Sequence, residues 1–115
     1  MTTHELKTWP EPFEAVWRGL KTYEIRKDDR GFVVGDLLLL REWQPEREWT
    51  TDGHRLMPEA GYDGYTGRVV LATVSYVTRG PAWDVPLGMI VMALDNGRAC
   101  YDYKPAPLST KAVKP

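Results

Sequence analysis

Residues 19–30, GLKTYEIRKDDR, mark the point at which an expected helix gives way to an expected strand. Gly19 suits the end of a helix because glycine readily adopts the left-handed conformation found there. From residue 22 to residue 27, apolar and polar residues alternate with the period of a strand. Three polar side chains therefore share one face: Thr22, Glu24 and Arg26. Two apolar side chains share the other: Tyr23 and Ile25. The stretch predicts a row of ionisable groups on a rigid element beside a helix end.

The segment before this stretch predicts a first strand followed by one amphipathic helix. Residues 4–9 favour a short strand with Leu6 pointing inward, and Pro10 and Pro12 suit the first turn of a helix. Four apolar residues then recur at the spacing of one helix face: Phe13, Val16, Trp17 and Leu20. We expect Trp17 to belong to the core through this face.

The segment after it predicts mainly strands. Residues 37–42 indicate a buried strand that is apolar on both faces, preceded by a tight Gly-Asp turn. Residues 66–78 are rich in Val, Thr and Tyr and form the longest candidate strand, and residues 88–94 form a last apolar strand. Residues 43–65 show no sustained period and contain several Gly and Pro, which indicates a long excursion or an irregular hairpin.

One early helix and about five or six strands indicate an α+β fold. A small barrel is the expected arrangement, because a barrel protects the strand edges that an open sheet leaves exposed. A chain of 115 residues fits one domain, which we place at residues 1–96. Residues 97–115 contain three prolines, four basic residues and one acidic residue, which predicts a flexible, mildly basic tail.

The composition argues against several classes of protein. A net charge of −1 is unlike that of a nonspecific DNA-coating protein, which carries a large positive excess. The single cysteine excludes an intrachain disulfide, and two scattered histidines give no metal-ligand spacing. Neither a signal-peptide pattern nor an apolar run of bilayer length is visible. We therefore expect a cytoplasmic protein, monomeric, with no cofactor, no metal and no membrane partner.

Five short motifs follow one another along residues 4–95. They are HELK at 4–7, GxKTxExRxxDR at 19–30, VGDxL at 34–38, YTGR at 65–68 and MIVM at 89–92. In this order they resemble the ASCH domains of the PUA-like superfamily, and more closely a small ASCH-like family of phages and bacteria. The resemblance implies a pseudo-barrel with a cleft between the first helix and the barrel, lined by Lys21, Glu24 and Arg26. Relatives with this fold bind RNA or modified bases.

One ASCH branch hydrolyses the amide of acetylated cytidine with a lysine, a threonine nucleophile and a distant glutamate. Its lysine matches Lys21, whereas its threonine falls at the position of Glu24. Residues 66–78 contain no glutamate that matches the third member. Two of the three catalytic positions depart from that branch, so its mechanism does not carry over to this chain.

We expect the cleft to bind RNA or a modified nucleotide or nucleoside. Lys21 would hold a phosphate or lose a proton and act as a base, and Glu24 would accept from a base or simply pair with Arg26. The expected ligand-binding residues are His4, Lys7, Lys21, Thr22, Glu24, Arg26, Arg30 and Tyr65. Within this set Tyr65 would stack a base, as aromatic residues of the 43–65 excursion also would.

Two other functions fit the same sequence. A hydrolase acting on a modified nucleobase or on RNA would use Lys21 and Glu24 as acid–base groups. A protein-interaction adaptor would instead use the Trp-rich residues 43–65. The sequence fits binding and catalysis equally well, because the same lysine and glutamate would serve either function.

Overall fold

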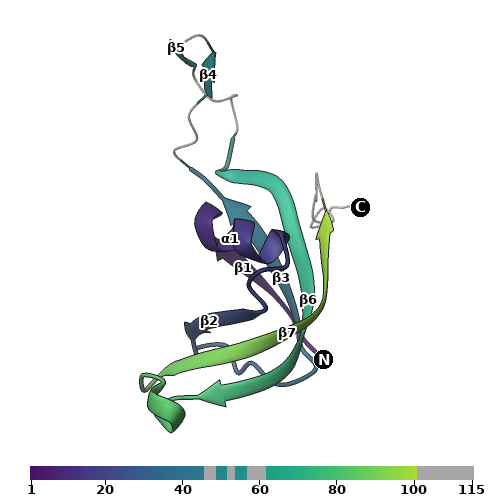
Figure 1. The fold of residues 1–115 in the computed structure, drawn as a ribbon, viewed down its shortest axis with the longest axis vertical. Helices are drawn as coiled ribbons and strands as arrows, with labels where there is room; N and C mark the ends of the chain where they lie inside the picture. Colours follow the sequence, from purple (N-terminus) through teal and green to yellow (C-terminus); the bar gives the residue numbers. More distant parts are fainter. Residues whose placement is uncertain (46–48, 52–53, 57–61, 101–115) are drawn as a thin grey trace, which may run out of the picture.

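The computed structural model describes residues 1–45, 49–51, 54–56 and 62–100. Along these residues the elements are β1 (Thr3–Thr8), α1 (Pro10–Trp17), β2 (Tyr23–Lys27), β3 (Leu37–Trp43), β4 (Trp49–Thr51), β5 (His54–Leu56), β6 (Tyr65–Arg79), the 3₁₀ helix η1 (Ala82–Asp84) and β7 (Met89–Cys100). The main sheet has the strand order β1-β3-β6-β7-β2 and curls into a half-barrel with α1 beside it (Figure 1). The expected α+β fold with a barrel-like sheet and an early helix is confirmed.

The sheet combines one parallel strand pair with three antiparallel pairs. β1 runs parallel to β3, while β3 with β6, β6 with β7 and β7 with β2 are antiparallel. The register between β6 and β7 shifts at two places, between Leu71 and Thr73 and between Val74 and Tyr76. Such irregularities bend a strand pair, and the two long strands curve together (Figure 1). The curvature turns the two edge strands of the sheet, β1 and β2, toward each other.

The C-terminal strand is longer than the sequence pattern predicts. β7 runs to Cys100, whereas the apolar pattern predicts a strand ending at residue 94 and a domain ending at residue 96. The added residues pair with the first half of β6, with Val69 opposite Cys100 and Val70 opposite Ala99. Backbone pairing with β6 therefore extends the strand where the apolar alternation has already ended. Residues 101–115, the rest of the expected tail, lie outside the described residues.

The helix follows the predicted pattern except at its end. α1 ends at Trp17, and Gly19 closes it with a φ of +76° and an N–H that donates to the carbonyl oxygen of Val16 at 2.9 Å. Trp17 packs against the core as expected. Leu20 does not: it is 78% exposed, because the chain leaves the helix before reaching it. In the part of the chain that the structure describes, no helix is long and apolar enough to cross a membrane.

The hydrophobic core lies between α1 and the main sheet. Its fully or nearly fully buried side chains come from α1, from four strands and from the segment before β3: Leu6, Phe13, Val16, Phe32, Leu38, Leu40, Val70, Val74, Ile90 and Met92. Leu39 is buried as well, so β3 is apolar on both faces, which confirms the sequence prediction. This packing fixes the position of α1 over the sheet.

The 43–65 excursion contains a small hairpin. β4 and β5 pair antiparallel with each other and form a separate two-stranded sheet, drawn beyond the end of the main sheet in Figure 1. This confirms the expected irregular hairpin. Residues 46–48, 52–53 and 57–61 of the excursion lie outside the described residues.

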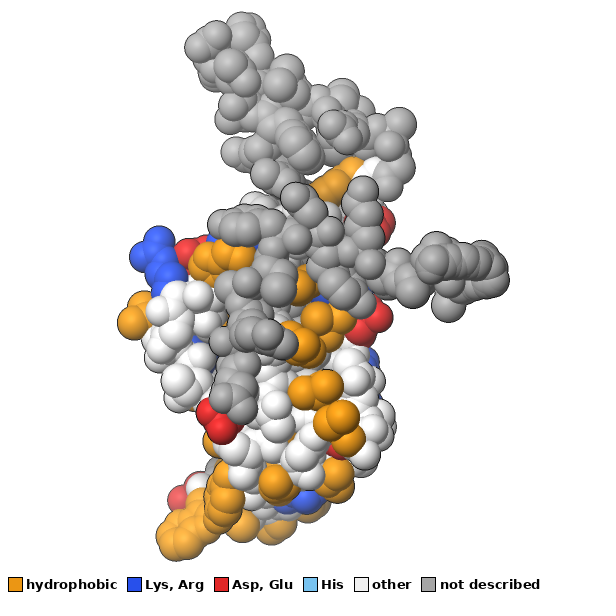
Figure 2. Space-filling model, turned by 90° about the vertical axis from the view of Figure 1, so that its right-hand side faces the viewer, with side chains coloured by type: hydrophobic (Ala, Val, Ile, Leu, Met, Phe, Trp, Pro, Cys, Tyr) orange, Lys and Arg blue, Asp and Glu red, His pale blue; other side chains and the backbone are white. Residues whose placement is uncertain are grey.

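The connection from β6 to β7 exposes apolar side chains. Trp83 is 90% exposed, and Leu87, four residues later, is 81% exposed. Figure 2 shows hydrophobic side chains gathered at the lower end of the molecule, where Figure 1 places the connection from β6 to β7. Trp83 also has a φ of +55°, a conformation that is uncommon for residues other than glycine.

Candidate functional site

A cleft of about 490 Å³ opens between β1, the start of α1 and β2. Its lining residues are Lys7, Thr8, Trp9, Pro12, Lys21, Tyr23, Glu24, Ile25 and Arg26. β1 and β2 are the edge strands of the main sheet, so the cleft lies along the seam at which a closed barrel would pair them. The structure brings Lys21, Glu24 and Arg26 together in this cleft, with α1 forming part of its wall.

Glu24 is a buried carboxylate between two cations. Its side chain is only 5% exposed, Oε1 accepts a hydrogen bond from Lys21 Nζ at 3.1 Å, and Oε2 accepts one from Arg26 Nε at 2.6 Å. The alternation along β2 explains this position, because Glu24 points inward while Tyr23 and Ile25 point outward and are about half-exposed. The predicted two-faced strand is present, and its polar face is the buried one.

Arg26 and Arg30 bridge the seam with their side chains. Arg26 Nη2 donates to the carbonyl oxygen of Lys7 at 2.8 Å and to Thr8 Oγ1 at 3.2 Å. Arg30 Nη1 donates to the carbonyl oxygen of Glu5 at 2.8 Å. Both carbonyls belong to edge strand β1, whose outer backbone groups need partners. Hydrogen bonds from two guanidinium groups thus connect the segment 26–30 to β1, where backbone hydrogen bonds between β1 and β2 would close a full barrel.

The cleft has more positive than negative charge. Lys7, Lys21 and Arg26 line it together with the single carboxylate of Glu24. Lys21 Nζ donates further to the carbonyl oxygen of Tyr23 at 2.8 Å, and its side chain is 18% exposed. Lys7 Nζ lies 3.9 Å from the centre of the Trp43 ring and, within the described part of the chain, has no carboxylate partner. A local positive field of this kind attracts anions even on a chain of net charge −1.

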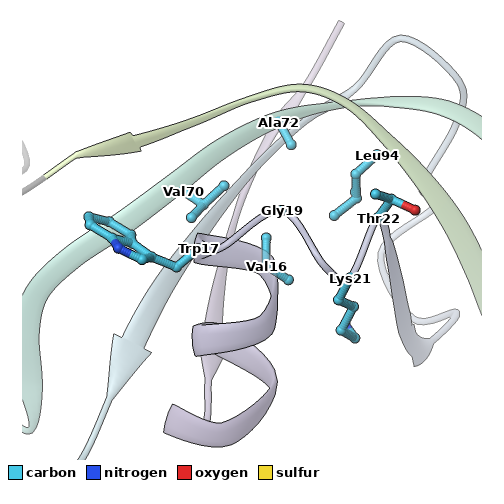
Figure 3. Close-up of a pocket in the computed structure, with 8 residues that line it drawn as sticks. All are labelled: Val16, Trp17, Gly19, Lys21, Thr22, Val70, Ala72 and Leu94. Atoms are coloured by element: carbon cyan, nitrogen blue, oxygen red, sulfur yellow. The ribbon is translucent and has the colours of Figure 1, made fainter.

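A second hollow, of about 220 Å³, shares Lys21 with the cleft. Figure 3 shows its lining: Val16, Trp17, Gly19, Lys21, Thr22, Val70, Ala72 and Leu94. Thr22 and Leu94 lie on one side and Trp17 on the other, while the Lys21 side chain extends away from Leu94 (Figure 3). Thr22, a predicted site residue, therefore borders this hollow and not the cleft.

The structure places His4 away from the cleft. Its ring is buried, with Nε2 2.9 Å from Asp36 Oδ2 and the ring centre 4.6 Å from that of Phe32. The hydrogen bond from His4 lowers the pKa of Asp36, and the backbone N–H groups of Thr2 and Val33 add to this effect against the opposing influence of burial. His4 thus anchors the start of β3 to β1.

Arg30 and Tyr65 also lie outside the cleft lining. Arg30 borders a small hollow with Asp29 and Phe32 on the other side of Arg26. The Tyr65 ring stacks on the guanidinium of Arg41, which lies 3.8 Å from the ring centre. Among the predicted residues, those that the structure brings together in the cleft are Lys7, Lys21, Glu24 and Arg26.

Five residues of the cleft lining are not among the predicted site residues: Thr8, Trp9, Pro12, Tyr23 and Ile25. Trp9 is the most informative of them, because its side chain is 58% exposed at the start of α1. In the sequence, the Trp-Pro pair indicates only where the first strand stops, and the exposure of Trp9 beside the cleft is visible only in the folded chain. Thr8 becomes part of the site only through its long-range contact with Arg26.

A second charged cluster fastens α1 to the sheet. Glu42 on β3 is buried and accepts from Arg68 Nε at 3.0 Å, from Arg68 Nη2 at 2.9 Å and from Thr66 Oγ1 at 2.7 Å. Burial alone would raise the pKa of Glu42, but these hydrogen bonds outweigh it and lower the pKa. Arg68 Nη2 also donates to Glu14 of α1 at 2.7 Å, and its guanidinium lies 4.7 Å from the Trp17 ring centre. The charges of this cluster pair with one another, and through Arg68 they link α1 to β3 and β6.

No group of three His, Cys, Asp or Glu side chains comes together as a metal site within residues 1–45, 49–51, 54–56 and 62–100. The cleft thus offers ammonium, guanidinium, carboxylate, hydroxyl and aromatic groups. These groups can hold an anion and a flat ring side by side.

Comparison with known proteins identifies the family. Residues 3–94 match the model described as "Domain of unknown function (DUF3850)", and the chain belongs to this family. A stretch of 40 residues is 45% identical to the "Uncharacterized 12.9 kDa protein in GpA 3'region" of Escherichia phage P2. That match covers 35% of this chain and 37% of the phage protein, so the chain spans little more than a third of this relative.

Proposed function

We propose that this DUF3850 protein binds RNA or a modified nucleotide in the cleft between β1, α1 and β2, as a cytoplasmic protein. The observation that supports it most is the arrangement around Glu24, whose buried carboxylate holds the side chains of Lys21 and Arg26 at 3.1 and 2.6 Å. Both cations are thereby fixed at the wall of one cleft. Arg26 keeps its Nη1 donors and Lys21 one N–H, because their other donors are used by Glu24, Tyr23, Lys7 and Thr8.

A phosphate group is the anion that suits this wall. Arg26 presents Nη1, because Glu24, Lys7 and Thr8 already accept from its Nε and Nη2. Lys21 adds a point charge, and the Lys7 ammonium over the Trp43 ring adds a third cation. Trp9 and Tyr23 supply flat, partly exposed rings within the same lining. Cations next to exposed aromatic rings are the combination by which proteins hold single nucleotides and unpaired RNA.

The proposal includes the finer assignment to the ASCH domains of the PUA-like superfamily. Its support is the half-barrel with an early helix and the position of Lys21, Glu24 and Arg26 in a cleft beside that helix. Because His4 contacts Asp36 and Tyr65 contacts Arg41 away from this cleft, we leave both out of the proposed ligand-binding residues.

A hydrolase at the same cleft is the second candidate. The buried Glu24 carboxylate beside the Lys21 ammonium favours it, since such a pair can orient and deprotonate a water. Each carboxylate oxygen already accepts one hydrogen bond from a cation but retains a second lone pair. Glu24 would then act on water, because Thr22, the nearby hydroxyl in sequence, lines the neighbouring hollow.

The test is a titration of the protein with 5′-mononucleotides and short RNAs, followed by NMR of the backbone amides. We expect the shifts to cluster on residues 21–26 and Lys21→Ala to weaken binding at least about tenfold, the loss of one charge-assisted contact. Lys27→Ala is the matched control, because Lys27 is an exposed lysine of the same strand and does not line the cleft. Shifts confined to residues after 96, or equal effects of the two variants, would contradict the proposal.

Turnover distinguishes the second candidate. The same nucleosides and RNAs are incubated with the protein and analysed by chromatography. A hydrolase predicts product formation that Glu24→Gln abolishes while binding persists, because the amide keeps the shape and loses the base. Binding of these ligands without any product would contradict the hydrolase function.

A further inference from the structure

Trp9 separates the cleft from another hollow. On its far side lies a hollow of about 320 Å³, lined by Trp9, Pro10, Trp43, Gln44 and Pro45. Trp9 is the residue that borders both spaces, and its side chain is 58% exposed. The exposed Trp9 ring therefore borders a space in the cleft and a space on the Trp43 side, which we call the Trp9–Trp43 hollow.

The ring of Trp43, which forms the wall next to Trp9, is held in place from several directions. Its centre lies 5.0 Å from that of Trp9 at an interplanar angle of 67°, the edge-to-face arrangement that aromatic pairs favour. Its Nε1 donates to the carbonyl oxygen of Asp63 at 3.3 Å, and Lys7 Nζ lies over the ring at 3.9 Å. An aromatic platform that is fixed before binding loses little conformational entropy when a ligand stacks on it.

The two hollows differ in charge. The cleft contains three cations and Glu24, whereas the described residues that line the Trp9–Trp43 hollow include no ionisable side chain. A charged phosphate suits the cleft, and an uncharged, flat ring suits the Trp9–Trp43 hollow. With the phosphate of one nucleotide at Lys21 and Arg26 in the cleft, a following nucleotide would bring its base to the Trp9–Trp43 hollow.

We propose that the ligand of this protein is a single-stranded nucleic acid of at least two nucleotides, with Trp9 as the stacking residue between two nucleotide subsites. This inference rests on the proposed function and adds the length and the strandedness of the ligand. Unpaired bases are required, because a duplex keeps its base faces stacked and out of reach of Trp9.

The experiment compares 5′-phosphorylated uridine mono-, di- and tetranucleotides and a hairpin RNA by calorimetry. We expect the dinucleotide to bind more tightly than the mononucleotide. We expect the paired stem of the hairpin RNA to contribute no affinity. Trp9→Ala should weaken binding of the dinucleotide about 5- to 140-fold, the range for loss of one stacked base. Because Trp9 also lines the cleft, the mononucleotide should lose affinity too, but less, so that the gain in affinity from mono- to dinucleotide shrinks. Trp9→Phe keeps a ring and should lose less.

Trp83→Ala is the matched control, because Trp83 is 90% exposed at the β6–β7 connection and absent from both linings. Circular dichroism verifies that each variant is folded. Equal affinity for the mono- and dinucleotide, or no effect of Trp9→Ala beyond that of Trp83→Ala, would overturn this inference and leave the proposed function intact. Absence of binding by every nucleotide would overturn both.

Discussion

Arg26 on β2 donates through Nη2 to the carbonyl oxygen of Lys7 on β1 at 2.8 Å, and so connects the two edge strands of the main sheet. The same guanidinium holds Glu24 at 2.6 Å and lines the cleft. One side chain therefore closes the half-barrel and faces the ligand that we propose. Structure and binding are coupled at this residue, since a ligand that draws Arg26 away loosens the seam.

Arg26→Ala should therefore lower stability as well as binding. The variant leaves the buried Glu24 with Lys21 alone and removes the donor to the Lys7 carbonyl oxygen. We expect a loss of about 1–3 kcal/mol in the free energy of unfolding, measured by urea denaturation. Arg18→Ala is the control, because Arg18 is an exposed arginine paired with the helix residue Glu14, and it should cost about 0.5 kcal/mol or less. Equal losses for both variants would show that the seam does not depend on Arg26.

Local sequence patterns predicted the strands and the helix because each has its own period. The alternation around Glu24 and the helix face of Phe13 and Val16 depend only on neighbouring residues. Which face of β2 is buried depends instead on Arg26 reaching β1, 18 and 19 residues away. The pattern alone shows two faces and does not show which one meets the seam.

The candidate site was predicted in part for the same reason. Lys21, Glu24 and Arg26 belong to one short segment, so their proximity follows from the sequence. His4 was grouped with them because it starts the same motif series, but its partner is Asp36, 32 residues away. Trp9 was missed because its neighbour Pro10 marks a boundary in the sequence, while its exposure between two hollows is a tertiary property.

Arg68→Ala should be among the most destabilising charge removals in the described residues. It removes two hydrogen bonds to the buried carboxylate of Glu42 and one to Glu14 on α1. We expect a loss of about 2–4 kcal/mol in the free energy of unfolding, because the buried carboxylate of Glu42 is left without its cation. The loss is smaller than for a fully buried pair because the guanidinium of Arg68 is partly exposed. The double variant Arg68→Ala/Glu42→Gln should recover part of this loss. If the double variant is no more stable than Arg68→Ala, the loss comes from the missing contact between Arg68 and Trp17 and not from the unpaired carboxylate.

Asp36 should make the fold sensitive to acid. Its pKa lies below the ordinary value of 3.8, chiefly because of the hydrogen bond from His4. A lowered pKa in the folded state contributes stability above the ordinary value and loses it as the pH falls through the lower one. We expect Asp36→Asn to flatten the decline in stability between about pH 5 and about pH 2, measured by urea unfolding at each pH. Asp29→Asn, at an exposed carboxylate, should keep the wild-type slope.

Gly64→Ala should displace Trp43 and weaken the proposed stacking. A Cβ at Gly64 would collide with Nε1 of Trp43 and lie 2.9 Å from its Cδ1, at a φ of +97°. Gly35→Ala is the matched control, because Gly35 has the same φ of +97° but open space around its Cβ position. Both variants should lose about 1–2 kcal/mol through left-handed strain. Only Gly64→Ala should also shift the tryptophan emission spectrum and reduce the gain in affinity from mono- to dinucleotide. If both variants change the emission equally, the position of Trp43 does not depend on Gly64.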